Sequence, residues 1–145
     1  MCYTNFKKNK KGTNMSQKSQ FVEYIPALML AGVSGDIYTE KGKAYQQVYM
    51  DDGIAMIQEE KEAIVIDVRR PAEFAEGHIP GAMNIPNEEI GTDEIPRLPL
   101  KEQRIFVYCR SGRRSKQACL KLFKLGYTNL VEFGGILDYD GEMET

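Results

Sequence analysis

Two continuous apolar runs constrain the fold of this chain more than any other feature of its sequence. Ala63–Ile66 and Ile105–Tyr108 carry apolar side chains at consecutive positions, without the alternation that a half-exposed strand would show. Strands with both faces buried have this pattern, as in a parallel sheet that helices cover on both sides. The two runs therefore predict central strands of an α/β domain.

Further β-type runs and two amphipathic stretches alternate with these strands. Helical spacing of apolar residues predicts one helix over residues 51–60 and a second over residues 115–125, which Gly126 would end. Strands that alternate with helices predict a three-layer α/β fold, whose ligands bind beyond the carboxyl ends of the strands. The predicted strands are Gln46–Tyr49, Ala63–Val68, Ala82–Ile85, Ile105–Tyr108 and Asn129–Phe133.

The length of 145 residues and a hydrophobic share of 42% predict one globular domain with an appended segment. Residues 1–20 are polar and rich in lysine, asparagine and serine, so we expect a disordered basic tail there. Residues 21–44 contain glycines that interrupt any long element, and the sequence leaves their structure open. The regular pattern begins near Tyr45, which places the domain over residues 45–142.

The distribution of charge bears on partners and on location. Residues 1–20 hold five lysines and no acid, whereas the rest of the chain holds 14 basic and 21 acidic residues, a net charge of −7. An acidic body argues against nucleic acid as a partner, and the basic start is either a solvated tail or a contact for anionic surfaces. The apolar stretch over residues 25–33 is too short to span a bilayer and is a poor signal segment. We therefore expect a cytoplasmic protein without membrane contact, with export or membrane anchoring as the alternative.

Three cysteines and one histidine offer little for a metal site or a disulfide framework. Cys2, Cys109 and Cys119 form no CxxC pair, and His78 is the only histidine. Metal sites of the Cys/His type need closely spaced ligands, so we predict no metal and no cofactor. Cys119 falls on the apolar stripe of the second predicted helix, where we expect it to pack in the core.

The segment from Cys109 to Ser115 carries the chemistry that the sequence predicts. It follows a buried strand and leads into a helix, which places Cys109 at the carboxyl edge of the sheet, just before a helix N-terminus. Backbone N–H groups of such a loop can converge on an anion, and a glycine permits the turn. Cations and a helix N-terminus favour the thiolate, which is the reactive form of cysteine. The candidate substrate-binding residues are Arg110, Ser111, Gly112, Arg113, Arg114 and Ser115.

These residues have different expected roles. Cys109 is the candidate nucleophile, and the alternative is a buried structural cysteine beside a solvated loop. Arg110 and Arg113 either attract anionic donors or only solvate the loop, whereas Arg114 could instead turn inward and brace it. Ser115 is placed to cap the helix that follows.

Three stretches of the sequence, taken in order, resemble the rhodanese family. They are Ile66–Phe74 (IDVRRPAEF), Glu76–Pro86 (EGHIPGAMNIP) and the loop Cys109–Ser115 (CRSGRRS). Their order and spacing are similar to those of the family over about residues 45–142. The resemblance implies a five-stranded parallel sheet flanked by helices.

The resemblance also implies an activity. Cys109 would take a sulfane sulfur from a small anionic donor such as thiosulfate, become a persulfide, and pass the sulfur to cyanide or a thiol. The N–H groups from Arg110 to Ser115 would hold the persulfide or the departing sulfite. The loop from Cys109 to Arg114 is one residue shorter than in the related cell-cycle phosphatases, which favours sulfur over phosphate. The alternatives are a sulfur-carrier or interaction module served by a sulfur-relay partner, and a phosphatase or arsenate-reductase-like activity.

Asp67 and Arg69 follow a buried strand at the same edge of the sheet. We expect them to support the loop from behind, through a contact between Asp67 and an arginine. The alternative is a turn or helix cap before Pro71, and structural support is favoured over direct catalysis. His78 lies in a Gly-His-Ile-Pro-Gly turn, and the resemblance gives it a structural role.

Overall fold

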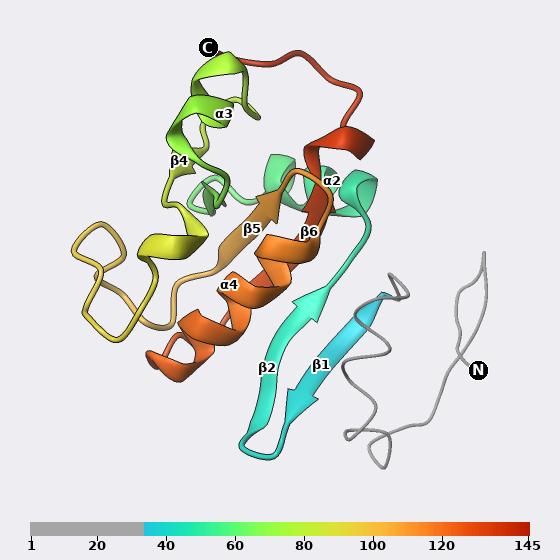
Figure 1. The fold of residues 1–145 in the computed structure, drawn as a ribbon. Helices are drawn as coiled ribbons and strands as arrows, with labels where there is room; N and C mark the ends of the chain where they lie inside the picture. Colours follow the sequence, from blue (N-terminus) through green and yellow to red (C-terminus); the bar gives the residue numbers. More distant parts are fainter. Residues whose placement is uncertain (1–33) are drawn as a thin grey trace.

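In residues 34–145, which the computed structural model describes, six strands form one sheet in the order β1-β2-β6-β5-β3-β4 (Figure 1). The predictions for residues 1–20 and 21–33 lie outside the described part of the chain. The strands are β1 (Gly35–Thr39), β2 (Gly42–Gln47), β3 (Ile64–Asp67), β4 (Met83–Asn84), β5 (Ile105–Cys109) and β6 (Leu130–Gly135). The helices are α2 (Met50–Glu59), α3 (Pro71–Glu76) and α4 (Arg113–Lys124), with 3-10 turns η2 (Asn87–Glu89) and η3 (Ile136–Asp138).

The α/β fold is confirmed. The sheet has six strands instead of the five that were expected, and the additional strand is antiparallel to its neighbour. All five predicted strands are present with shifted ends, and β1 is added to them. β1 pairs with β2 antiparallel, whereas the other neighbouring strands pair parallel. Only Glu40 and Lys41 separate β1 from β2, and so short a link permits only an antiparallel hairpin. Residues 35–44 therefore extend the sheet at one edge.

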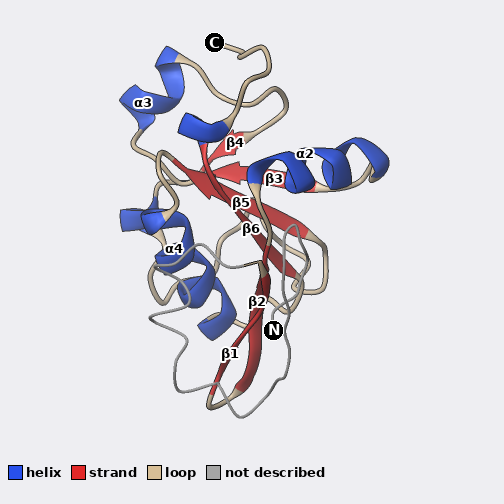
Figure 2. Ribbon diagram, turned by 90° about the vertical axis from the view of Figure 1, so that its right-hand side faces the viewer, coloured by secondary structure: helices blue, strands red, loops and turns tan. Residues whose placement is uncertain are grey.

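Helices cover both faces of the sheet, as a three-layer fold requires. Along β5, Ile105, Val107 and Cys109 pack in the cluster on the α4 side, whereas Phe106 and Tyr108 pack in the cluster that includes residues of α2. Figure 2 shows α2 and α4 on opposite sides of the sheet. All five side chains of β5 are completely buried, which explains the continuous apolar run in the sequence.

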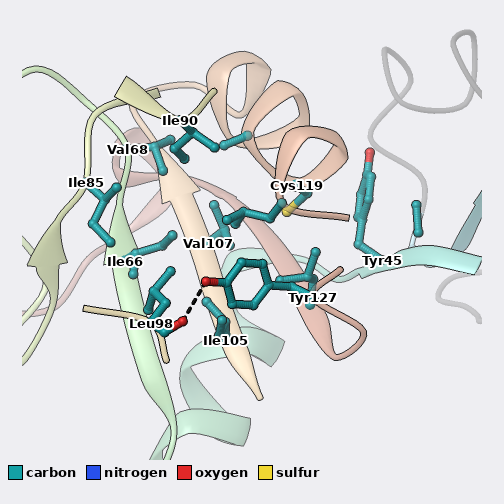
Figure 3. Packing of buried hydrophobic residues seen from close by; sticks show 14 of the residues in the cluster. Tyr45, Ile66, Val68, Ile85, Ile90, Leu98, Ile105, Val107, Cys119 and Tyr127 are labelled. Atoms are coloured by element: carbon teal, nitrogen blue, oxygen red, sulfur yellow. Dashed lines mark hydrogen bonds between the residues drawn. The ribbon is translucent and has the colours of Figure 1, made fainter. Parts of the chain in front are cut away.

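The core on the α4 side fixes the position of this helix. Ala118, Cys119 and Leu122 of α4 are completely buried against the sheet, and Cys119 lies within that core in Figure 3. The expectation that Cys119 packs in the core is thus confirmed. Beyond the helix, the hydroxyl of Tyr127 donates a hydrogen bond to the carbonyl of Leu98 at 2.6 Å (Figure 3). This packing holds the N-terminus of α4 at the carboxyl end of β5.

Candidate active site

Cys109 is the last residue of β5, and α4 begins close behind it at Arg113. The link is this short because Gly112 adopts a left-handed conformation with a φ of 104°. Residues with a side chain rarely adopt this conformation, so the predicted turn at Gly112 is confirmed. The carboxyl end of the strand and the N-terminus of the helix therefore meet beside the sulfur of Cys109.

The sulfur of Cys109 is buried and has polar groups beside it. The exposed fraction of Cys109 is 0%. The backbone N–H of Gly112 donates a hydrogen bond to Sγ at 3.0 Å, and Oγ of Ser115 lies 3.5 Å from Sγ. Among the hydrogen bonds described for residues 34–145, no other loop amide reaches this sulfur. Of the amides expected to converge on the sulfur, the described hydrogen bonds therefore show Gly112 alone, whose N–H group can stabilise negative charge on sulfur.

The arginines of the loop divide into two groups. Arg110 and Arg113 are exposed and form no ion pair within residues 34–145. Arg114 turns toward α3, where its guanidinium donates to the Glu73 carboxylate at 2.8 and 3.2 Å. This hydrogen bond lowers the pKa of Glu73 to about 2. Arg114 therefore braces the loop, whereas Arg110 and Arg113 are available to an anion from solvent.

Ser115 is not the helix cap that its place in the sequence suggests. Gly112 is the N-cap residue, and no side chain caps the helix. Because the left-handed Gly112 lets α4 begin at Arg113, Ser115 falls within the first turn. Its side chain is completely buried, and its hydroxyl contacts both Sγ of Cys109 and the carboxylate of Glu132.

Glu132 is a completely buried carboxylate on β6. Its Oε2 accepts hydrogen bonds from the Ser115 hydroxyl at 2.5 Å and from the backbone N–H of Gly134 at 3.0 Å. Its Oε1 lies 3.5 Å from Nζ of Lys116 and has no hydrogen-bond partner among the described residues. Burial raises the pKa of Glu132, and Lys116 partly opposes this effect. Through Ser115, the Cys109 loop therefore contacts a carboxyl group whose charge can change with pH.

The last residue of β6 and the turn η3 that follows it hold the loop from another side. Gly135 lies opposite Cys109 in the register of β5 and β6. A Cβ atom on Gly135 would lie 2.1 Å from the carbonyl oxygen of Arg110, so only glycine allows so close an approach. The same carbonyl accepts a hydrogen bond from the backbone N–H of Leu137 at 3.1 Å. The backbone of the loop is thereby fixed directly after the cysteine.

Asp67 and Arg69 form a buried ion pair that contacts a different segment. The guanidinium of Arg69 donates to the Asp67 carboxylate at 3.0 Å through Nε and at 2.7 Å through Nη2. Nη2 also donates to the carbonyl of Gly77 at 2.7 Å. The arginine that Asp67 binds is thus Arg69, and no hydrogen bond or ion pair described for residues 34–145 joins this pair to the Cys109 loop. The brace that does reach the loop from this side is Glu73 with Arg114.

The surroundings of His78 are those of a structural residue. Its ring stacks on Phe74 with centroids 3.6 Å apart, and its Nδ1 lies 2.9 Å from the Phe74 carbonyl oxygen. Its backbone exchanges two hydrogen bonds with Glu144, at 2.9 and 2.8 Å. No contact described for residues 34–145 links it to Cys109, in keeping with the role that the resemblance implies.

Sequence reasoning missed Glu73, Glu132 and Gly135. Glu132 carried a usable signal, because it is the one charged residue in the predicted strand Asn129–Phe133. A charged residue in a buried strand needs a polar or charged partner. Buried charges with perturbed pKa values gather at functional sites, so such a residue is a candidate for a site. Glu73 and Gly135 gave weaker signals, since the groups they meet depend on how distant segments pack.

Two further features of residues 34–145 bear on the expectations from the sequence. No group of three or more His, Cys, Asp or Glu side chains in this range is arranged to hold a metal ion. No helix in the same range combines the length and apolar character needed to cross a bilayer.

Known proteins resemble this chain in sequence and in fold. The family described as the Rhodanese-like domain matches residues 50–140. A sulfurtransferase from Allochromatium vinosum is 40% identical over 80 residues, which cover 53% of this chain and 71% of that protein. The thiosulfate sulfurtransferase PspE of Escherichia coli is 40% identical over 73 residues, which cover 50% of this chain and 70% of that protein.

A solved structure of a rhodanese with anions from E. coli agrees with these matches. It superposes with a TM-score of 0.53 at 35% identity, covering 57% of this chain and 98% of the other. The fold and the loop define an α/β domain with a cysteine at the carboxyl edge of its sheet. The match over more than half of its length shows that this chain belongs to the rhodanese family.

Proposed function

We propose that the protein is a sulfurtransferase that carries a sulfane sulfur as a persulfide on Cys109. The observation that supports this most is the position of Sγ at the carboxyl end of β5, 3.0 Å from the N–H of Gly112. Exposed Arg110 and Arg113 belong to the same loop. The names of the two sequence relatives, both sulfurtransferases, agree with this chemistry.

The transfer takes two displacement steps. In the first, the Cys109 thiolate attacks the outer sulfur of a donor such as thiosulfate. A sulfur–sulfur bond to Cys109 forms, the sulfur–sulfur bond of the donor breaks, and sulfite leaves with the bonding electrons. In the second, cyanide or a thiolate attacks the outer sulfur of the persulfide, takes it, and leaves the Cys109 thiolate. Cys109 therefore ends the cycle as it began.

The loop contributes electrostatic stabilisation and attraction. The N–H of Gly112 stabilises negative charge on sulfur, and the first N–H groups of α4 have no partner within the helix. Arg110 and Arg113 draw an anionic donor toward the loop. Because Cys109 has no exposed surface, side chains of the loop must move before a donor reaches the sulfur.

Comparing the two buried cysteines provides the test. Purified protein supplied with thiosulfate and cyanide should form thiocyanate, and Cys109→Ser should reduce the rate at least about a thousandfold, because the nucleophile is lost. Cys119→Ser is the matched control, since Cys119 is also a buried free cysteine, and it should keep most of the activity. Activity that survives in Cys109→Ser would overturn the proposal.

A sulfur-carrier role served by a relay partner is the second candidate. The complete burial of Cys109 favours it, because a docked partner protein would open the loop more readily than a small anion. Protein isolated from cells would then carry one extra sulfur on Cys109 while turning over thiosulfate only weakly. If protein from cells carries no extra sulfur on Cys109 and turns over thiosulfate rapidly, the enzyme is favoured over the sulfur carrier.

A further inference from the structure

The hydroxyl of Ser115 can serve only one acceptor at a time. Three acceptors lie near it: Oε2 of Glu132 at 2.5 Å, the Gly112 carbonyl at 3.0 Å and the Gly134 carbonyl at 3.5 Å. A hydroxyl has a single hydrogen and two lone pairs. The shortest contact assigns that hydrogen to Glu132, which leaves a lone pair of Ser115 facing Sγ of Cys109. In this arrangement, Ser115 accepts a hydrogen bond from the Cys109 thiol.

The same three groups have a second arrangement. When Glu132 carries a proton, it can donate to Ser115, and the Ser115 hydrogen is then free to point at a Cys109 thiolate. A thiolate and a carboxylate joined through one buried hydroxyl repel each other in a low dielectric, so the pair favours a single negative charge. The two arrangements place that charge on Glu132 or on Cys109.

We propose that Glu132 is a positioning residue that sets the direction of the Ser115 hydrogen bond and thereby couples the charge on Cys109 to a proton on Glu132. This proposal depends on the proposed function in one respect, which is that Cys109 is the reactive group. The proton leaves Sγ for Oγ of Ser115, the hydroxyl proton moves to Oε2 of Glu132, and the electron pair of the S–H bond stays on sulfur. The attack on an anionic donor and the transfer to an anionic acceptor then need no further proton. Glu132 therefore keeps the proton from Cys109 until the thiol forms again.

The surroundings of Glu132 allow this change of charge. On α4, Lys116 lies 3.5 Å from Oε1, and Cys119 is close enough to the carboxylate to interact with it electrostatically. On β2, Tyr45 is near both Glu132 and Cys119, and Figure 3 labels Tyr45 and Cys119 within one core. Burial raises the pKa of Cys119 and of Tyr45, so neither competes for the charge near neutral pH. Among the described residues, Lys116 is the cation that acts on Glu132, and Arg114 interacts electrostatically with Cys109 from the other side of the loop.

The coupling also has a consequence for the resting protein. With Glu132 ionised, Cys109 is held as a thiol, which oxidants attack more slowly than a thiolate. A neutral side chain in place of Glu132 would remove the competing charge. Cys109 should then become reactive at a lower pH than in the wild type.

The rate of alkylation of Cys109 by iodoacetamide, followed against pH, tests the coupling. Glu132→Gln should lower the pH of half-maximal rate by about one unit, which makes alkylation about tenfold faster at a pH below that midpoint. Glu59→Gln removes an exposed carboxylate from α2 and should leave the profile unchanged. A folded Glu132→Gln variant with the wild-type profile, or with a midpoint moved upward, would overturn the proposal.

The hydroxyl is tested separately from simple repulsion through space. In a Ser115→Ala background, Glu132→Gln should move the midpoint by less than half as much as in the wild-type background. An equal shift in both backgrounds would show that Ser115 transmits nothing. Alkylation reports on Cys109 whether or not sulfur is transferred, so failure of the coupling and failure of the sulfurtransferase proposal give different results.

Infrared spectra of the wild type give a readout that needs no variant to fold. At a pH where Cys109 is a thiolate, a band of a protonated buried carboxyl group should be present. The band should vanish when iodoacetamide converts Cys109 to a neutral thioether, because Glu132 then ionises. A carboxyl spectrum that alkylation does not alter would contradict the coupling.

Discussion

Two carboxylates are completely buried in residues 34–145, Asp67 on β3 and Glu132 on β6, and their surroundings differ. Asp67 accepts hydrogen bonds from the guanidinium and from the backbone N–H of Arg69. Glu132 has one cation at 3.5 Å and one oxygen without a hydrogen-bond partner in the described part of the chain. The fully paired carboxylate holds two segments together, whereas the partly paired one can change its charge. Of the two, only Glu132 connects with Cys109, through Ser115.

Asp67→Asn should produce the largest loss of stability, because it leaves Arg69 buried without its counter-charge. Breaking one side of a buried ion pair costs about 3–5 kcal/mol in the free energy of unfolding. Urea denaturation at neutral pH measures this loss. A loss below about 1 kcal/mol would show that the pair does not hold the fold as its geometry indicates.

Glu132→Gln should change stability less, and by an amount that depends on pH. Burial raises the pKa of Glu132 above its ordinary value of 4.5, so ionisation in the folded state opposes folding. The wild type should therefore lose stability relative to the variant as pH rises above 4.5 and through the folded pKa. We therefore expect the difference in stability between the variant and the wild type to grow in favour of the variant as pH rises from 4 to 8. Urea denaturation across this range checks the slope, and a difference that does not vary with pH would contradict it.

Glu73→Gln provides the comparison with a partly exposed pair and should have the smallest effect. The side chains of Glu73 and Arg114 are 25% and 28% exposed, so the loss should be about 1 kcal/mol or less. The pKa of Glu73 is lowered to about 2, so the stabilisation is present above 4.5 and disappears as pH falls toward 2. Thermal unfolding at pH 7 and at pH 2 should show the difference at pH 7 alone. A difference of equal size at pH 7 and at pH 2 would show that the loss of stability does not come from the charge of Glu73.

The strands and the position of Cys109 follow from local patterns in the sequence. Ile105–Tyr108 is apolar at every position because both faces of β5 are covered, and the loop must then begin at the carboxyl edge of the sheet. The additional strand, Gly35–Thr39, gives no such signal, since it contains a single buried residue, Ile37, and begins with an exposed glycine and an exposed aspartate. The position of this strand depends on its pairing with β2 at the edge of the sheet, and no local pattern in the sequence indicates that pairing.

The contacts around the loop were harder to predict, because they depend on tertiary register. The sequence predicts that Ser115 caps the helix, whereas Gly112 is the N-cap residue and α4 begins at Arg113, which places Ser115 within the first turn. Glu132 meets Ser115 only because β6 lies beside β5 beneath α4. Period-two alternation would place an apolar residue at that point of the strand, and the exception marks the site.

Peptide mass spectrometry of protein treated with thiosulfate, without a reductant, tests most directly whether Cys109 carries the sulfur. One additional sulfur atom is expected on the peptide that contains Cys109, in an amount equal to the sulfur that cyanide then removes as thiocyanate. The peptide that contains Cys119 should remain unmodified. Thiocyanate formation by protein whose Cys109 never gains a sulfur, from thiosulfate or from a persulfide donor, would contradict the proposed chemistry.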